Sequence, residues 1–356
     1  MRTLNKILLI RFSSMGDIIL TSPLIRMLRT SYPTAQVDFM VKREYAELLK
    51  CNPHLTSLIE LRSPDRHELK ALRDRVRQER YDAIIDLHNS LRSRYIRMFS
   101  GARSVRVVNK RLAERDFLVR FKFNFYRGVV PVAERYLETV RKLGVRDDGG
   151  GLEIHVPEEI LQSVGALMGK YKIERYTRVL GMAPMARHFT KRWLPERFVE
   201  FGVRYVKETG AKILILGSKE ETEVCGDIAQ MINAGAGANA ADSLAGKISL
   251  IETAAVLDYC TLVLSNDTGI MHLAAARQRQ VIAIFGSTVR EFGFFPYRTS
   301  SIVLERAGLS CRPCSHIGLA KCPKGHFRCM KEIGVDEVLA ATRALSSRTE
   351  QPQPVG

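Results

Sequence analysis

The feature that most constrains the fold is an alternation of short apolar runs with longer amphipathic segments, which occurs twice along the chain. The runs over 6–12 and 82–87 are almost continuously apolar, as expected of strands that helices cover on both faces. Such alternation predicts a parallel α/β sheet. The breaker sequence Asp147-Asp148-Gly149-Gly150-Gly151 interrupts the pattern, which then restarts.

The sequence therefore predicts an α/β protein with two Rossmann-like domains, whose parallel sheets face a central cleft. We place the domains at residues 1–165 and 172–333, followed by a helix at 334–346 and a disordered tail at 347–356. The expected strands are 6–12, 36–41, 57–61, 82–87, 152–156, 178–183, 211–217, 261–265 and 280–285. The expected helices include one running through about residue 31, then 67–78 and 157–171.

Composition excludes several classes of protein. The 356 residues are 46% hydrophobic and 26% charged, as in globular domains large enough to fold without disulfides. No run approaches the ~20 apolar residues of a membrane-spanning helix, and the N-terminus lacks the pattern of a secretory signal. We therefore expect a cytoplasmic protein.

Charge is unevenly distributed along the chain. The net charge is +17, and residues 1–150 hold 30 basic against 17 acidic residues. Residues 89–127 contain 11 basic residues and only two acidic ones, Glu114 and Asp116. This excess indicates either a polyanionic partner, such as nucleic acid, an anionic membrane or a phosphorylated substrate, or only a solvated basic face.

Ligands of open parallel sheets bind beyond the carboxyl ends of the strands, and two loops there are candidates. The first, Ser13-Ser14-Met15-Gly16-Asp17, follows the first strand. Gly16 permits close approach to the backbone, and Asp17 could act as general base, as helix N-cap or as both. The second, Ser265-Asn266-Asp267-Thr268-Gly269, precedes a helix whose N-terminus could bind an anion. His272, one turn further, is either a ligand contact or a packed side chain.

A third candidate, Thr190-Lys191-Arg192-Trp193, follows the first strand of the second domain. Lys191 and Arg192 could meet a diphosphate at the same sheet edge, although such a pair is also common on surfaces. Trp193 is expected to anchor the loop. The chain has no P-loop, no GxGxxG after a strand and no Asp-x-Asp metal clamp, which weakens ATPase and NAD-dehydrogenase interpretations. If the ligand is a nucleotide-sugar, its leaving diphosphate must be stabilised by Lys191, Arg192 and the helix N-terminus, without a divalent ion.

Four of the seven cysteines are clustered, with the spacing C-x2-C-x7-C-x6-C. They are Cys311, Cys314, Cys322 and Cys329. In an intracellular protein such a cluster favours metal binding or catalysis over disulfides. The second pair lacks the spacing of a zinc ribbon, so a structural zinc, packed thiols and disulfides all stay open.

The motifs MGDIILTSPLIRMLR, TKRW and SNDTGIMHLAAA…IAIFGST resemble those of the bacterial heptosyltransferases, glycosyltransferase family 9, from about Lys6 to Ile333. The segment CRPC…KCPKGHFRCM is similar to one found in the heptosyltransferase II group. The resemblance implies a GT-B fold with an N-terminal acceptor domain and a C-terminal nucleotide-sugar domain. It implies heptose transfer from ADP-heptose, with inversion and no cofactor required for catalysis. The implied acceptor is the phosphorylated lipid A–core of lipopolysaccharide at the anionic inner-membrane surface, and nucleic acid is not an expected partner.

The resemblance also implies roles for individual residues. Asp17 is the catalytic base, with Ser14, Met15, Gly16, Arg120 and Lys122 on the acceptor side. The implied donor-binding residues are Thr190, Lys191, Glu220 (or Glu221), Asp267, Thr268, Gly269 and His272. The chain departs from the family at Ala276–Gln280, which stands where Ala-x-Gly-x-Pro is usual, and we expect this to alter a turn and not the chemistry. The loop before Thr190 also lacks the frequent Pro-Gly-Ala pattern.

Two alternatives to this function stay open. One is a member of the same family with a different sugar or acceptor. The other is a basic, zinc-bearing nucleic-acid-binding protein, which would leave two α/β domains and the 267–272 loop unexplained. Residues 116–130 (DFLVRFKFNFYRGVV) mix aromatic and basic side chains. They suit the interface of an anionic bilayer, or a partly buried element with a basic outer face.

Overall fold

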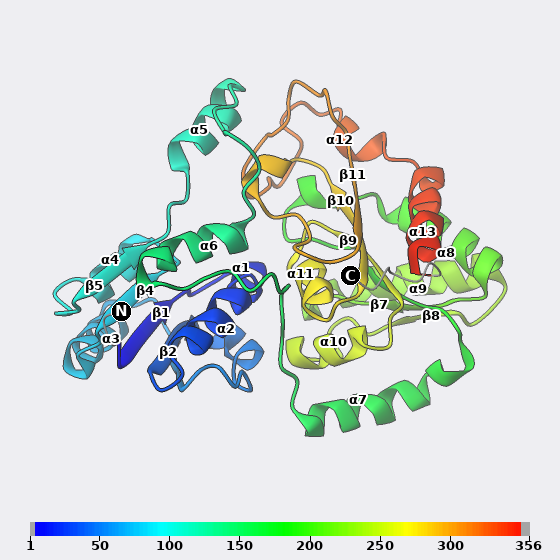
Figure 1. Ribbon diagram of the computed structural model, residues 1–356. Helices are drawn as coiled ribbons and strands as arrows, with labels where there is room; N and C mark the ends of the chain where they lie inside the picture. Colours follow the sequence, from blue (N-terminus) through cyan, green and yellow to red (C-terminus); the bar gives the residue numbers. More distant parts are fainter. Residues whose placement is uncertain (1–3, 350–356) are drawn as a thin grey trace. The chain divides into compact units, whose positions relative to one another are not determined.

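The computed structural model describes residues 4–349 and divides into two compact units. The first unit contains residues up to 112 together with 130–155, and the second contains 113–129 together with residues from 156 onward. Each unit is built on its own parallel β-sheet (Figure 1). The prediction of two parallel α/β domains is therefore confirmed.

The first unit holds a five-stranded sheet in the order β3-β2-β1-β4-β5. Helices α3 (Arg66–Glu79) and α4 (Leu91–Arg97) cover one face, where Val76 and Ile96 join strand residues such as Leu8 in one core. Helices α2 (Ser22–Ser31) and α6 (Val132–Val140) pack against each other. The strands are β1 (Lys6–Ile10), β2 (Gln36–Lys42), β3 (Ser57–Leu61), β4 (Ala83–Asp86) and β5 (Ser104–Val107).

The second unit holds a six-stranded sheet in the order β11-β10-β9-β6-β7-β8. The strands are β6 (Val179–Ala183), β7 (Lys212–Ile215), β8 (Ala241–Ser243), β9 (Leu262–Asn266), β10 (Gln280–Phe285) and β11 (Ser301–Glu305). Alternate strand residues such as Leu180 pack on one face against α8 (Pro195–Thr209), α9 (Thr222–Ala236) and α13 (Val335–Thr349). Successive side chains of a strand point to opposite faces, and Gly181 lies against Leu257 of α10 (Leu250–Leu257).

The remaining elements are short or lie outside the two sheets. The helices are α1 (Met15–Ile19), α5 (Leu112–Phe121), α7 (Glu158–Lys170), α11 (Gly269–Ala276) and α12 (Arg328–Lys331). The 3-10 turns are η1 (Arg43–Leu48), η2 (Arg141–Leu143), η3 (Ile173–Arg175), η4 (Phe189–Lys191), η5 (Lys219–Glu221) and η6 (Arg290–Phe292). Among residues 4–349, no helix combines the length and apolarity needed to cross a bilayer.

The order of the strands locates the ligand-binding edge of each sheet. In the first unit, β2 and β3 lie on one side of β1, and β4 and β5 lie on the other side. In the second unit, β7 and β8 lie on one side of β6, and β9 to β11 lie on the other. The strand order therefore reverses between β1 and β4, and between β6 and β9. Ligands of open α/β sheets bind at such switch points, beyond the carboxyl ends of the strands. The loops after β1 and β4, and those after β6 and β9, are thereby brought together within their own units.

Several predicted elements differ from the structure. The helix predicted to run through residue 31 is two helices, α1 and α2, and Pro23 stands at the start of the second. Residues 152–156 are not a strand, because the Glu153 N–H donates to Ser22 Oγ at 3.0 Å and not to a neighbouring strand. Strands β5, β8 and β11 were not predicted. All three lie at sheet edges, where burial is incomplete and the apolar signal is weak.

The domain boundaries also differ from the expected ones. The first domain was expected to end at residue 165, inside helix α7, but the whole helix packs against α10 and belongs to the second unit. Residues 113–129 likewise join the second unit. Helix α13 continues to Thr349, so the predicted tail begins inside a helix, and residues 350–356 lie outside the described residues.

Candidate active site

Asp17 is held by a set of donors at the carboxyl end of β1. The N–H and Oγ of Ser14 donate to Asp17 Oδ2 at 3.2 and 2.8 Å. Arg11 Nη2 lies 2.6 Å from Asp17 Oδ1, and the Tyr136 hydroxyl donates to the same oxygen at 3.2 Å. Ser14 is therefore the N-cap of α1 and Asp17 stands at the third helical position, so of the alternatives for Asp17 the N-cap is wrong. Met15 and Gly16 lie between Ser14 and Asp17 in the first turn of α1.

The surroundings of Asp17 keep its carboxylate ionised. Burial alone would raise the pKa of Asp17, but the Arg11 charge and the Ser14 hydrogen bonds outweigh it and hold the pKa below its ordinary value. The ionised form is the one that can accept a proton. Arg11 is itself fixed, because its Nη1 donates to the Leu87 carbonyl at 2.6 Å.

His88 joins this group from the neighbouring strand and was not identified from sequence. It follows β4, and its ring lies 4.8 Å from that of Phe12. Burial and the nearby Arg11 charge lower the pKa of His88 to about 3, so the imidazole is neutral at physiological pH. Arg11 and Tyr136 were missed as well. For Arg11 and His88 the available signal was topological, because polar residues that follow adjacent buried strands meet at one sheet edge. Tyr136 lies within α6 and has no such signal.

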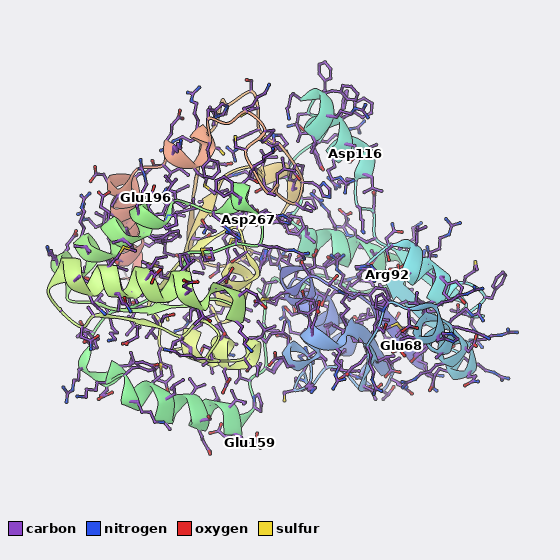
Figure 2. The ribbon with its side chains drawn as sticks, turned by 180° about the vertical axis from the view of Figure 1, so that it is seen from behind. Glu68, Arg92, Asp116, Glu159, Glu196 and Asp267 are labelled. Carbon is purple, nitrogen blue, oxygen red and sulfur yellow. The ribbon has the colours of Figure 1, made fainter. Side chains whose placement is uncertain are left out.

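In the second unit, Lys191 and Asp267 form an ion pair at the switch point. Lys191 Nζ lies 2.7 Å from Asp267 Oδ2, and the Thr288 hydroxyl donates to the same oxygen at 2.7 Å. Asp267 is 7% exposed and Lys191 belongs to η4, after β6. Figure 2 shows Asp267 within the second unit, near its strands. The structure thus brings together the two predicted loops after β6 and β9.

Buried side chains fix these two loops in place. Asn266 Oδ1 accepts from the Trp193 N–H at 2.9 Å, and Asn266 Nδ2 donates to the Pro184 carbonyl at 2.7 Å. Trp193 is fully buried and its Nε1 donates to the Ile333 carbonyl at 3.1 Å, which confirms its anchoring role. Thr190 is 2% exposed, and its hydroxyl accepts from the Leu319 N–H at 2.8 Å.

The N-terminus of α11 faces the same loop. Thr268 is the N-cap, makes no side-chain capping hydrogen bond, and its Oγ1 lies 3.2 Å from Ser265 Oγ. The first-turn N–H groups from Gly269 onward are therefore not used by the cap, as an anion site requires. His272 is 3% exposed and packs near Phe294, with ring centroids 6.5 Å apart.

Of the other residues predicted to bind the nucleotide-sugar, some are held by neighbouring groups and one is exposed. The Arg192 guanidinium folds back on its own loop, donating to the carbonyls of Ala186 at 2.5 Å and Arg187 at 3.5 Å. Glu221 is occupied by a capping box, since its Oε2 accepts from the Ser218 N–H at 2.8 Å. Glu220 is exposed on η5, which makes it the more accessible of the two carboxylates.

The four clustered cysteines lie in one region as free thiols. Cys314 donates to the Cys311 carbonyl at 3.2 Å, and its N–H donates to the Ser287 carbonyl at 3.1 Å. The pKa of Cys329 is raised to about 11, mainly by burial and to a smaller extent by the other three thiols. All seven cysteines are unpaired, so no disulfide closes the cluster within the described chain.

The segment with Arg120 and Lys122 consists of α5 and the irregular stretch after it. Lys122 Nζ donates to the carbonyls of Val119 at 2.8 Å and Pro313 at 2.5 Å. Asn124 Nδ2 donates to Glu291 Oε1 at 2.9 Å. Both anchors lie in the second unit. Lys122 is thus a tether of the segment, whereas Arg120 is exposed.

Two parallel α/β units, each with polar loops at its switch point, define a GT-B glycosyltransferase architecture, and comparison with known proteins agrees. The family model for glycosyltransferase family 9 (heptosyltransferase) matches residues 69–322. The chain therefore belongs to this family and is a glycosyltransferase.

Individual relatives and solved structures are similar over nearly the whole chain. Lipooligosaccharide heptosyltransferase 2 of Haemophilus influenzae is 28% identical over 304 residues, which cover 80% of this chain and 84% of the relative. The family 9 glycosyltransferase of Veillonella parvula superposes with a TM-score of 0.78 at 21% identity, covering 97% and 98% of the two chains. The Escherichia coli ADP-heptose LPS heptosyltransferase II superposes with a TM-score of 0.71 at 22% identity, covering 97% and 100%.

Proposed function

We propose that this protein transfers heptose from ADP-heptose to the inner core of lipopolysaccharide, with inversion at the anomeric carbon. The observation that carries the proposal is the Lys191–Asp267–Thr288 group beside the N-terminus of α11. It offers a cation and unused backbone N–H groups to an anionic ligand, at the sheet edge where such ligands bind. The family assignment, and a structural neighbour named for ADP-heptose, support this donor.

The reaction is a single displacement. The acceptor hydroxyl oxygen attacks the anomeric carbon while Asp17 takes the hydroxyl proton, and the bond from that carbon to the ADP oxygen breaks. ADP departs with the electron pair, and its growing negative charge is stabilised by Lys191 and the α11 N-terminus. Thr190, Thr268, Gly269 and His272 complete the diphosphate side, and Glu220 is assigned to the ribose.

Asp17 suits the role of base because it is ionised and oriented at once. Four donor atoms from Ser14, Arg11 and Tyr136 fix its two oxygens. The Arg11 charge lowers its basicity, so proton transfer would accompany carbon–oxygen bond formation and not precede it. Ser14, Met15 and Gly16 are the acceptor-side residues next to it in the chain.

We further propose that the enzyme works at the anionic cytoplasmic face of the inner membrane, where a lipid-linked acceptor is found. The docking element is an aromatic patch on α5 and the residues after it, each 46–63% exposed. The patch comprises Phe117, Phe121, Phe123 and Phe125, whose rings pack against one another. Figure 2 shows α5, marked by Asp116, with its side chains projecting outward. Exposed Arg120 and Arg127 add positive charge, and aromatic and basic side chains together favour an anionic interface.

The cysteine cluster is assigned a structural role, because thiols contribute nothing to attack by a hydroxyl. Replacing Cys314 and Cys322 with Ser is expected to lower the melting temperature before it lowers turnover per folded molecule. Elemental analysis of the wild type beside the Cys314→Ser/Cys322→Ser variant distinguishes a Cys-ligated zinc, which the variant loses, from packed thiols. Loss of turnover with an unchanged melting temperature would contradict the structural role.

The direct test of function is product formation with defined substrates. Purified protein is incubated with ADP-heptose and a panel of deacylated inner-core acceptors, and products are identified by mass and anomeric configuration. Heptosylated product with inverted configuration is expected. ADP-hexoses and UDP-sugars serve as matched donors, and transfer only from one of these would assign the enzyme to a different sugar within the family.

A further inference from the structure

A group of three side chains in the first unit has the composition of a metal site. His54, Glu153 and His155 each offer one ligand atom, and the three atoms lie within 4.8 Å of one another. Nε2 of His54 and Nε2 of His155 are each 3.4 Å from Glu153 Oε1. Across residues 4–349, no other group of three histidine, cysteine or acidic side chains converges so closely.

The donor set and its spacing match those of zinc. Two imidazoles and one carboxylate form a common zinc ligand set, with bonds of about 2.0–2.2 Å to a tetrahedral ion. Two ligands on such an ion are separated by about 3.3–3.5 Å. The two nitrogen–oxygen distances of 3.4 Å fall in this range without any rearrangement.

Two of the candidate ligand atoms lack other partners. Glu153 Oε1 and His155 Nε2 are buried, and neither makes a hydrogen bond with any group in the described chain. A buried polar atom left unsatisfied costs roughly 1–3 kcal/mol, and such atoms are rare in native proteins. An ion bound between them would satisfy both.

One helix holds the group in position. Along α2, Ser22 Oγ accepts from the Glu153 N–H at 3.0 Å, Arg26 binds Glu153 and Arg29 Nε donates to the His54 carbonyl at 3.1 Å. The positions 22, 26 and 29 are four and three residues apart, so they share one helix face. These contacts from α2 fix the orientation of the candidate ligands, as the hydrogen-bond partners of metal ligands do in known metal sites.

The arginine on this face does not compete for the ligand oxygen. Arg26 Nη1 lies 2.6 Å from Glu153 Oε2, which leaves Oε1 for a metal. Arg26 Nε is itself paired with Asp148 Oδ2 at 2.7 Å, so part of its charge is neutralised.

We propose that His54, Glu153 and His155 bind one divalent transition-metal ion of the zinc class, with a fourth position open to water. The ion would tie the irregular residues 152–155, which follow the glycine-rich breaker, to the turn that carries His54. It is independent of both the proposed catalytic residues and the cysteine cluster.

The test measures metal binding by the full-length protein in the Cys314→Ser/Cys322→Ser background, which removes the competing thiol cluster. Metal-stripped protein is titrated with Zn²⁺ by calorimetry and with Co²⁺ by visible absorption. We expect one ion per chain, a raised melting temperature, and tetrahedral Co²⁺ bands without a thiolate charge-transfer band. His54→Gln and His155→Gln should each weaken Zn²⁺ binding by at least on the order of tenfold, as loss of even an outer-shell partner does.

The matched control is His67→Gln, which removes an exposed histidine from α3 and should leave binding unchanged. Melting curves of all variants without metal separate loss of binding from loss of folding, and the milder single glutamine variants retain the Glu153–Arg26 pair. The proposal is overturned if the cysteine-deficient protein binds no Zn²⁺. It is equally overturned if the His54 and His155 variants bind Zn²⁺ as tightly as the His67 control.

Discussion

The ammonium of Lys191 lies 2.7 Å from the carboxylate of Asp267, and the two side chains come from loops 76 positions apart in sequence. The pair is largely buried at the switch point of the second sheet. Lys191 therefore neutralises a carboxylate that would otherwise repel a diphosphate. In the proposed donor site, the lysine would then both bind phosphate and offset the charge of Asp267.

Lys191→Ala should lower kcat/KM for ADP-heptose by roughly 10- to 100-fold, because a charge-assisted contact to phosphate contributes about 1.5–3 kcal/mol. The KM for acceptor should change little. Steady-state kinetics with each substrate varied in turn checks this. Lys170→Ala, which removes an exposed lysine from α7, is the control. An unchanged kcat/KM for the donor would remove Lys191 from the proposed site.

His88 should make the protein less stable in mild acid. Its pKa is about 3 when folded, because of burial and Arg11, against an ordinary value of 6.5. At neutral pH the His88 imidazole is unprotonated in both the folded and the unfolded state. Below pH 6.5 it becomes protonated in the unfolded chain but stays neutral in the folded protein. The free energy of unfolding therefore falls as the pH falls. At pH 5 the loss is about 2 kcal/mol.

Urea unfolding of wild type and His88→Gln at pH 7.5 and pH 5 measures this effect. The variant should lose less stability between the two pH values by about 2 kcal/mol. His67→Gln is the control, since His67 is exposed on α3. Equal pH dependence of wild type and His88→Gln would show that the imidazole titrates normally.

Gln278→Gly should stabilise the second unit. Gln278 has a φ of 54°, the left-handed region in which a side chain costs about 1–2 kcal/mol. It occupies the position where the family usually has glycine, so the departure noted in the sequence is a backbone strain in the turn before β10. Glycine relieves the strain in the folded state, but its greater backbone flexibility also stabilises the unfolded state. The net effect should raise the free energy of unfolding by up to about 1 kcal/mol, seen as a raised melting temperature. A lowered melting temperature would contradict it.

Arg120→Gln combined with Arg127→Gln should weaken binding to anionic vesicles. Each basic residue near such a surface contributes about 1 kcal/mol, so two together predict roughly a 30-fold lower partition coefficient at low salt. Sedimentation with phosphatidylglycerol vesicles measures it. Arg66→Gln with Arg146→Gln, two exposed arginines outside the aromatic patch, is the matched control. Equal losses in both pairs would indicate a diffuse charge effect and not a docking patch.

The buried strands and the loops after β1, β6 and β9 could be predicted from the sequence, because continuous apolar runs and the residues that end them are local signals. Side chains that contact the site from distant parts of the sequence could not be predicted in this way. Arg11, Tyr136 and His88 surround Asp17 only after folding, and Thr288 reaches Asp267 from the end of β10. The His54–Glu153–His155 group could not be predicted for the same reason, since His54 stands about 100 residues from the other two.

The edge strands and the segment after Leu112 show a second limit. Partial burial at β5, β8 and β11 weakens the apolar periodicity on which strand prediction rests. Residues 113–129 alternate aromatic and basic side chains, yet they form a helix and an irregular stretch tethered through Lys122 to Pro313. No local pattern encodes that tether.

The most direct test of the central claim is the turnover of Asp17→Asn with ADP-heptose and the inner-core acceptor, normalised to the folded fraction. Normalisation is needed because the change also leaves the buried Arg11 without its counter-ion. Asp74→Asn, which alters an exposed carboxylate on α3, is the control. General-base action by Asp17 predicts a kcat lowered by roughly 10²-fold or more with ADP affinity unchanged. A folded Asp17→Asn enzyme with near wild-type kcat would contradict it and leave Asp17 only its place in the capping box.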